Sequence, residues 1–319
     1  MRPTVNRRWG TVVRMVGGNA SRAVLAVAIA LVAMLARMTG LPAGIVPTPA
    51  PADPLVYVAL GDSYTSGPIV LPHDTTFVTQ GCGQSSRNYP HIAAALIKAD
   101  SFRDVSCGGA SIDDFSKGQD VVTAVNPPQY NSLNADVDVV TVGIGGNDVN
   151  FTGAATDCIQ PKPAALGGTP CKPMFVKNGV DTLSQKIAAM GIELGKALDH
   201  IHVLAPHAAV FVVGYPDAIP NTGKGCWPYV PILNVDMPYL LAKFKEMNAQ
   251  LKSTAQGHDS TYVDIYTSSI GHDVCKAPGL AWVNGAVLVP PSFPAHPNDL
   301  SFLNSGPIVA DAIEAKLHP

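Results

Sequence analysis

A chain of 319 residues is long enough for one sizeable α/β domain and short for two. Hydrophobic residues make up 47% of it and charged residues 14%, which is the composition of a folded globular protein. The formal net charge is −3 and no basic cluster follows the first 40 residues, so nucleic acid is excluded as an expected partner.

The first 40 residues are predicted to be an export signal. They contain six arginines and no acidic residue, and an apolar run at residues 23–35 follows most of these arginines. Basic residues before an apolar segment of this length are typical of a secretory signal, and the run is short for a membrane span. An uncleaved signal anchor is the alternative. The pair Arg7-Arg8 leaves a twin-arginine export route open.

Residues 41–54 are rich in proline and alanine and are expected to form an extended linker. Residues 55–319 then form a single domain. Without residues 1–40 the chain keeps 15 basic and 24 acidic residues, a formal charge of about −9. We expect a monomer outside the cytoplasm, either secreted or associated with the cell envelope, with at most a transient contact with the membrane or envelope.

Strand and helix patterns alternate along the domain. Residues 55–60 form a short apolar run that ends at Gly61 and is typical of a buried parallel strand. Helical spacing follows at residues 88–99, with Pro90 in the first turn. The remaining predicted elements are strands at 104–107 and 137–143, a helix at 181–204, a strand at 209–214, a helix at 237–255, a strand at 261–265 and a helix at 302–317. This alternation predicts a parallel sheet covered by helices on both faces.

Polar residues and glycines follow three of the predicted strands. Their sequences are Gly61-Asp62-Ser63, Gly108-Gly109 and Gly145-Gly146-Asn147-Asp148. A fourth segment, His296-Pro297-Asn298, precedes the last helix. Ligands of open parallel sheets bind at the carboxyl ends of the strands, so we expect these segments to form one site.

Ser63 is the candidate nucleophile of this site. A serine hydroxyl needs a base to take its proton and hydrogen-bond donors to hold the oxyanion that follows. His296 is the candidate base, and the donors are the amides of Ser63 and Gly109 with the side chain of Asn147. The turn lacks the Gly-x-Ser-x-Gly pattern of the α/β-hydrolase elbow. This chemistry needs no metal or organic cofactor, and the pair His200-Ile201-His202 has no third metal ligand that stands out in the sequence.

Six cysteines follow the N-terminal segment, and an even number in an exported chain predicts disulfides. They are Cys82, Cys107, Cys158, Cys171, Cys226 and Cys275. Six cysteines can pair in many ways, of which pairing in sequence order is the simplest. A zinc site is the alternative, but the chain has no Cys-x-x-Cys pair.

The four polar segments resemble the sequence blocks of the SGNH (GDSL) hydrolase family. The blocks appear here as Gly61-Asp62-Ser63-Tyr64, Cys107-Gly108-Gly109-Ala110-Ser111, Gly145-Gly146-Asn147-Asp148 and His296-Pro297-Asn298, in the family's order. One block alone carries little weight, whereas four in order are specific. The resemblance implies a three-layer α/β/α fold with a flavodoxin-like parallel sheet. It also implies Ser63 and His296 as catalytic residues, with Ser63, Gly109 and Asn147 as the oxyanion hole.

The chain is similar to one branch of that family, the secreted actinobacterial esterases and lipases. The branch pattern recurs as Cys82-Gly83-Gln84-Ser85 with Asn88-Tyr89-Pro90, as Ala205-Pro206 with Gly214-Tyr215-Pro216, and as Cys226-Trp227-Pro228. This resemblance implies three disulfides paired in sequence, namely Cys82–Cys107, Cys158–Cys171 and Cys226–Cys275.

One position departs from the family pattern. Most members carry aspartate three residues before the histidine, where this chain has Phe293. Some members of the branch orient the histidine with a backbone carbonyl instead. We therefore expect the carbonyl of Phe293 to accept a hydrogen bond from Nδ1 of His296, giving a Ser–His dyad. A distant carboxylate, Asp264 or Asp273, that folds back to the histidine is the alternative.

The implied function is a carboxylesterase or lipase that cleaves small-molecule or lipid esters, which would place the protein in lipid metabolism. A glycan or polysaccharide O-acetylesterase and an acyltransferase of the same fold are the enzymatic alternatives. A non-catalytic protein that binds the envelope or carbohydrate is a further alternative. The intact serine, glycine, asparagine and histidine segments argue against it.

Overall fold

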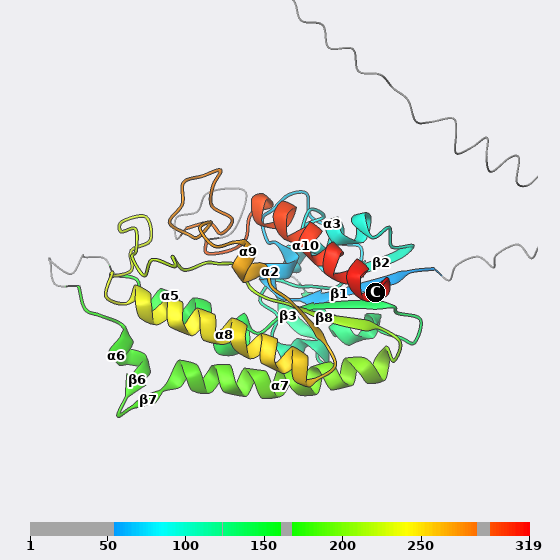
Figure 1. The fold of residues 1–319 in the computed structure, drawn as a ribbon, viewed down its shortest axis with the longest axis horizontal. Helices are drawn as coiled ribbons and strands as arrows, with labels where there is room; N and C mark the ends of the chain where they lie inside the picture. Colours follow the sequence, from blue (N-terminus) through cyan, green and yellow to red (C-terminus); the bar gives the residue numbers. More distant parts are fainter. Residues whose placement is uncertain (1–53, 123, 161–167, 286–293) are drawn as a thin grey trace, which may run out of the picture. The chain divides into compact units, whose positions relative to one another are not determined.

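A five-stranded parallel sheet lies at the centre of the computed structural model, which describes residues 54–122, 124–160, 168–285 and 294–319 (Figure 1). The strand order is β2-β1-β5-β8-β9, and every pairing is parallel. The strands are β1 (Val56–Gly61), β2 (Ser101–Asp104), β5 (Val139–Gly143), β8 (Ala209–Val213) and β9 (Thr261–Val263). The second strand lies on one side of the first and the three later strands on the other. This is the flavodoxin-like order that the resemblance to the SGNH family implied.

The strands are apolar on both faces and therefore need cover on both. Every residue of β5 is buried, and all but the first residue of β1 are buried. Side chains alternate between the faces, so Val58 and Leu60 belong to one core cluster while Tyr57 and Ala59 belong to the other. Crossover helices supply the cover that strands of this kind require.

Two pairs of helices cover the two faces of the sheet. Helices α3 (Tyr89–Leu96) and α10 (Asp299–Leu317) pack together on one face, and α7 (Thr182–Leu204) and α8 (Met237–Gly257) pack together on the other (Figure 1). The three-layer α/β/α architecture predicted from the sequence is confirmed. Among the described residues, none of the helices combines the length and hydropathy that crossing a bilayer requires.

The long helix α7 follows its apolar spacing. Asp181 caps its first turn by accepting hydrogen bonds from the amides of Leu183 and Ser184, a contribution of about 1 kcal/mol. Its core-facing side chains recur three or four residues apart and are buried as expected: Leu183, Ile187, Met190, Leu194, Leu198 and Ile201.

Shorter elements lie in the connections. The short helices are α2 (Ser63–Ser66), α4 (Gly146–Val149), α5 (Phe151–Asp157), α6 (Lys172–Phe175) and α9 (Ile265–Ser268). Single 3-10 turns occur at Gln80–Cys82, Ile112–Phe115 and Gln129–Ser132. Two small antiparallel pairs join β3 (Gln119–Val121) to β4 (Ala124–Asn126) and β6 (Val176–Lys177) to β7 (Val180–Asp181).

The second strand begins three residues earlier than the sequence predicted. We expected it at residues 104–107, whereas β2 spans Ser101–Asp104. The extended chain does continue, because the amides of Val105 and Cys107 donate to the carbonyls of Ala59 and Gly61. Val105 and Cys107 therefore indicated this extension and not the strand itself. The strand has the sequence Ser-Phe-Arg-Asp, in which Phe102 is the one apolar residue.

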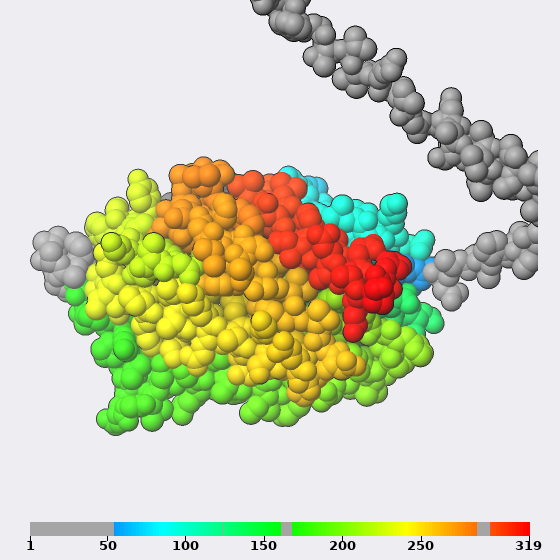
Figure 2. Space-filling model, viewed as in Figure 1, coloured from blue at the N-terminus to red at the C-terminus, as the bar shows by residue number. Residues whose placement is uncertain are grey.

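Contacts divide the chain into Met1–Ala52 and Asp53–Pro319. The expected export signal at residues 1–40, and all of the expected linker at 41–54 except Pro54, lie outside the described residues. Figure 2 shows one face of the second unit, on which α8 appears in yellow and α10 in red.

Three disulfides join the cysteines in sequence order. The pairs are Cys82–Cys107, Cys158–Cys171 and Cys226–Cys275. Each closes a loop that would otherwise be free in the unfolded chain, and loops of this length gain about 2–4 kcal/mol from such a bond.

Candidate active site

The candidate nucleophile lies where β1 and β5 end side by side. Gly61 pairs with Gly143 at the carboxyl edge of the sheet, and the chain then turns into α2. A side chain at Gly61 would be 2.7 Å from the carbonyl oxygen of Gly143, so only glycine fits there. Asp62 caps α2 by accepting the amide of Tyr64 at 2.8 Å. This turn sets Ser63 at the start of α2, with 8% of its surface exposed.

His296 reaches Ser63 from a segment 233 residues later in the chain. Its Nε2 lies 2.8 Å from Oγ of Ser63, and its Nδ1 lies 2.8 Å from the carbonyl oxygen of Pro294. A carbonyl oxygen only accepts, so Nδ1 carries the proton and Nε2 is left to accept from the serine hydroxyl. The carbonyl predicted at this place from the sequence was that of Phe293, which lies outside the described residues.

The histidine is poised as a neutral base. Burial lowers the pKa of His296 below the ordinary value of 6.5, and the hydrogen bond to the carbonyl of Pro294 offsets only part of that effect. The imidazole is therefore mostly unprotonated at pH 7 and can take a proton from Ser63.

The two carboxylates considered as partners of the histidine are engaged in their own loops. Asp264 caps α9 and accepts the amide of Thr267 at 2.9 Å. Asp273 accepts the amide of Cys275 at 2.9 Å and lies 3.6 Å from Nζ of Lys276. Within the described part of the chain, both carboxylates therefore bond to groups of their own loops and not to His296.

Three donors expected to hold an oxyanion are set at the turns of the site. Within the described residues, the amides of Ser63 and Gly109 have no hydrogen-bond acceptor. Gly109 has a φ of 81°, which glycine adopts without strain. The side-chain amide of Asn147 donates to the carbonyl of Ala110 at 2.8 Å. That bond uses one N–H of the amide, leaves the second available, and ties α4 to the turn of Gly109.

A small hollow opens beside the nucleophile. Its polar wall includes Ser63 and Asn147, and its apolar wall includes Phe151, Phe244 and Met247. The volume is about 20 Å³, roughly that of a single small group. Because apolar side chains line this wall, it is suited to the hydrocarbon end of an acyl group rather than to a charged one.

Two tyrosines connect the turns of the site, and sequence reasoning did not identify this role. The hydroxyl of Tyr64 donates to the carbonyl of Ala295 at 2.5 Å, next to the histidine. The hydroxyl of Tyr215 donates to Oδ2 of Asp62 at 2.5 Å and accepts the amide of Gly146 at 2.7 Å. The sequence signals were the segment Gly214-Tyr215-Pro216 just after a predicted strand and the place of Tyr64 next to Ser63 in the block Gly61-Asp62-Ser63-Tyr64.

Asp62 is a buried carboxyl group at the centre of these contacts. Burial raises its pKa to about 7, although the hydrogen bonds from Tyr215 and from the amide of Tyr64 act in the opposite direction. Its two oxygens face the turn of the nucleophile and the hydroxyl of Tyr215. It therefore supports the turn and does not face the reacting hydroxyl.

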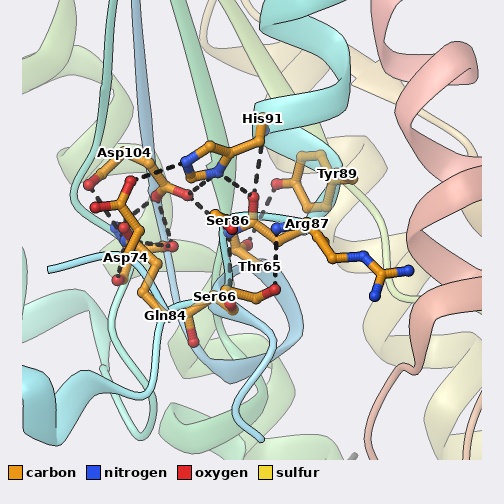
Figure 3. Close-up of polar contacts among 12 residues, drawn as sticks. Thr65, Ser66, Asp74, Gln84, Ser86, Arg87, Tyr89, His91 and Asp104 are labelled. Atoms are coloured by element: carbon orange, nitrogen blue, oxygen red, sulfur yellow. Dashed lines mark hydrogen bonds and ion pairs between the residues drawn. The ribbon is translucent and has the colours of Figure 1, made fainter. Parts of the chain in front are cut away.

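A second polar cluster lies behind α2, and Figure 3 shows its side chains. Asn88 donates to Oδ2 of Asp104 at 2.7 Å and to the carbonyl of Ser66 at 3.4 Å. His91 lies between Oδ1 of Asn88, at 2.7 Å, and Oδ2 of Asp74, at 3.1 Å. Burial raises the pKa of Asp104 despite these donors and the nearby His91. The cluster fastens the loop after α2 to β2 and has no contact with the reacting atoms of Ser63 and His296.

The chain is similar to known lipases and esterases. The model of the GDSL-like lipase/acylhydrolase family matches residues 59–300, which include all four segments. "Lipase 2" of Streptomyces coelicolor is 38% identical over 256 residues, which are 79% of this chain and 84% of that protein. An "Esterase" of Streptomyces scabiei is 31% identical over 305 residues, covering 84% of this chain and 88% of that protein.

A solved structure shares the fold. The crystal structure of phospholipase A1 from Streptomyces albidoflavus NA297 superposes with a TM-score of 0.66 at 24% identity. The match covers 81% of this chain and 99% of the other. At that identity the likeness bears on the architecture and not on the substrate.

Proposed function

The chain belongs to the GDSL-like lipase/acylhydrolase family and is a carboxylic ester hydrolase, and we propose that it works through an acyl-enzyme formed on Ser63. The observation that carries the proposal is the 2.8 Å contact between Oγ of Ser63 and Nε2 of His296. The free amides of Ser63 and Gly109 beside that contact support it.

In the first half of the reaction, Oγ of Ser63 attacks the carbonyl carbon of the ester while Nε2 of His296 takes its proton. The carbonyl oxygen becomes an oxyanion. The amides of Ser63 and Gly109 and the side chain of Asn147 hold it, each contributing about 3 kcal/mol. When the intermediate collapses, the alcohol leaves with the proton from Nε2 and the acyl group stays on Ser63.

In the second half, water attacks the acyl-enzyme and gives its proton to Nε2 of His296. The same three donors hold the second oxyanion. Collapse releases the carboxylic acid and returns the proton to Ser63. The carbonyl of Pro294 orients the imidazole, but it carries less charge than a carboxylate and stabilises the imidazolium less.

We assign the substrates to the acyl esters of small molecules or lipids. The apolar wall of Phe151, Phe244 and Met247 supports an acyl group at this place. Its small volume favours short acyl chains, which an O-acetylesterase acting on glycans would share. An acyltransferase would use the same acyl-enzyme with an alcohol in place of water.

We also propose that the domain works outside the cytoplasm. Three disulfides in the described structure fit an oxidising compartment. The basic and apolar sequence of residues 1–40 supports export, either with cleavage or as an anchor. Fractionating the producing cells and determining the N-terminus of the mature protein would test this proposal.

The test of function is hydrolysis of p-nitrophenyl acetate, butyrate and palmitate by the wild type, Ser63→Ala and His296→Ala. We expect both variants to lose at least about a thousandfold in kcat while keeping the wild-type fold. Full activity of Ser63→Ala would refute the acyl-enzyme mechanism. The chain-length profile separates an esterase from a lipase, and adding glycerol as acceptor reveals transfer in place of hydrolysis.

A further inference from the structure

One hydroxyl group bridges the turn of the nucleophile and the turn of the oxyanion asparagine. Tyr215 follows β8 and is 3% exposed. Its Oη accepts the amide of Gly146 at 2.7 Å, so its own proton must go to Oδ2 of Asp62, at 2.5 Å. Asp62 immediately precedes Ser63, and Gly146 immediately precedes Asn147.

The two turns come from different strands. Gly61 at the end of β1 pairs with Gly143 at the end of β5. Both strands end at this pair, so the sheet does not hold together the two turns that follow. The amide of Gly146 starts α4 and has no acceptor within that helix, as is general for the first turn of a helix. Tyr215 supplies that acceptor from a third strand.

The ring of Tyr215 is held independently of its hydroxyl. The backbone amide of Tyr215 donates to Oδ1 of Asn248 on α8 at 2.8 Å. The ring packs edge-on against Tyr64, with centroids 5.0 Å apart, and against Phe244, at 6.4 Å. Removing the hydroxyl alone therefore leaves the ring in place and breaks only the bridge between the two turns.

We propose that Tyr215 is a positioning residue that holds the side chain of Asn147 where the oxyanion forms relative to Oγ of Ser63. This inference rests on the proposed acyl-enzyme mechanism. Without the bridge, the amide of Gly146 and Oδ2 of Asp62 lose their partner in a buried place. Helix α4 then keeps its bonds to the turn after Gly109, through Asn147 and Asp148, but loses its bond to the turn of the nucleophile. A displacement of about 1 Å is enough to cost roughly a hundredfold in rate at a preorganised site.

The test is Tyr215→Phe assayed beside Asn147→Ala and the double variant. We expect Tyr215→Phe to lower kcat by about ten- to a hundredfold with KM changed less than about threefold, because the oxyanion exists only after substrate has bound. The double variant should be no slower than Asn147→Ala by more than about threefold, since Tyr215 acts through Asn147. Unchanged kcat in Tyr215→Phe, or losses that multiply in the double variant, would overturn the proposal.

Tyr57→Phe is the matched control. Tyr57 is also fully buried and its hydroxyl bonds to Oγ1 of Thr141 at 2.8 Å, but it lies within the sheet. The same loss of a buried hydroxyl should therefore leave kcat within about twofold. An equal loss of kcat in Tyr57→Phe would show that any buried tyrosine has this effect and would contradict a specific role.

A second variant keeps the hydroxyl and disturbs the bridge from the other side. In Gly146→Ala the new Cβ would lie 3.0 Å from Oη of Tyr215, which pushes the hydroxyl and the amide apart. We expect the same selective loss of kcat; a normal kcat would count against the proposal. Ser63→Ala is measured in parallel: activity in that variant refutes the mechanism itself, whereas inactivity of Ser63→Ala with a normal Tyr215→Phe refutes only the role of Tyr215.

Discussion

A backbone carbonyl orients His296 beside Ser63, a task that a carboxylate side chain performs in the Ser-His-Asp triad. Nδ1 of the histidine meets the carbonyl oxygen of Pro294 rather than a carboxylate in the described contacts. The carbonyl fixes the tautomer and the ring orientation, which are the geometric parts of the task. Its dipole stabilises the imidazolium only weakly, so the basicity of His296 is set mainly by its burial.

The pH dependence of kcat/KM should reflect the lowered pKa of the buried His296. Protonated His296 cannot accept a proton from Ser63, so activity rises with pH as the imidazole loses its charge. Because burial lowers the pKa of His296, the midpoint of this rise should lie below 6.5. A pH profile of kcat/KM from 4 to 9 on p-nitrophenyl butyrate measures it. A midpoint well above 6.5 would mean that a negative charge stabilises the imidazolium.

The local bonds of Asp264 and Asp273 lead to a second expectation. Each carboxylate already accepts an amide of its own loop. Asp264→Asn and Asp273→Asn should therefore each retain kcat within about threefold, although Asp273→Asn should lower the melting temperature because that carboxylate is buried. A collapse of kcat in either variant, with the fold intact, would identify a carboxylate partner of His296.

The positions of the proposed reacting groups could be read from the sequence, whereas the contacts that hold them could not. Ser63, Gly109, Asn147 and His296 lie in short segments that follow strands or precede a helix, so local sequence indicates their place. Tyr215 lies 153 residues after Asp62 and 69 residues after Gly146 in the sequence, and its hydroxyl bonds to both. Such a contact depends on how strands are ordered in the sheet, which no local pattern contains.

Among the elements, α2 and α3 depend on the polar cluster behind them (Figure 3). Asn88 caps α3 by accepting the amide of His91 at 3.2 Å, and it also bonds to Asp104 on β2. It reaches the carbonyl of Ser66 at the end of α2 as well. A single fully buried side chain thus connects two helices and a strand.

Asn88→Ala should therefore be strongly destabilising. It removes a helix cap, worth about 1 kcal/mol, and leaves the buried Asp104 without one of its donors, at about 1–3 kcal/mol. We expect a loss of roughly 2–4 kcal/mol in the free energy of unfolding, measured by urea denaturation. Asn304→Ala on the exposed side of α10 is the control and should change stability by less than about 0.5 kcal/mol. Equal stabilities of the two variants would contradict this role for the cluster.

The central elements followed from apolar runs, and the small ones did not. The cores of β1, β5 and β8 were predicted because strands buried on both faces leave a continuous hydrophobic signal. The antiparallel pairs β3–β4 and β6–β7 were missed because strands of two or three residues are too short to show an alternation of apolar and polar residues. The start of the edge strand β2 was displaced because three of its four residues are polar and leave no apolar run.

Within the unit from Asp53 to Pro319, the disulfides differ in how close they lie to the proposed active site. Cys107 immediately precedes Gly108 and Gly109. The amide of Gly108 donates to the carbonyl of Cys82, the disulfide partner of Cys107, at 2.9 Å. The Cys158–Cys171 bond lies between α5 and α6, in a connection without a proposed catalytic residue. The first bond therefore supports the oxyanion turn, and the second supports only the fold.

Removing each pair should separate these effects. Cys82→Ser with Cys107→Ser and Cys158→Ser with Cys171→Ser should each lower stability by about 2–4 kcal/mol. Only the first pair should also reduce kcat, by about tenfold, at a temperature where both variants are folded. Equal kcat values in the two variants would show that the Cys82–Cys107 bond does not act on Gly109.

The central claim is that the acyl group of the substrate is carried on Ser63 with His296 as base. The most direct test is covalent labelling with a p-nitrophenyl alkylphosphonate, followed by intact-mass measurement and peptide mapping. We expect one adduct per chain on Ser63, no adduct in Ser63→Ala, and labelling at least about a hundredfold slower in His296→Ala. An adduct on another residue, or equal labelling rates in the wild type and His296→Ala, would contradict the account.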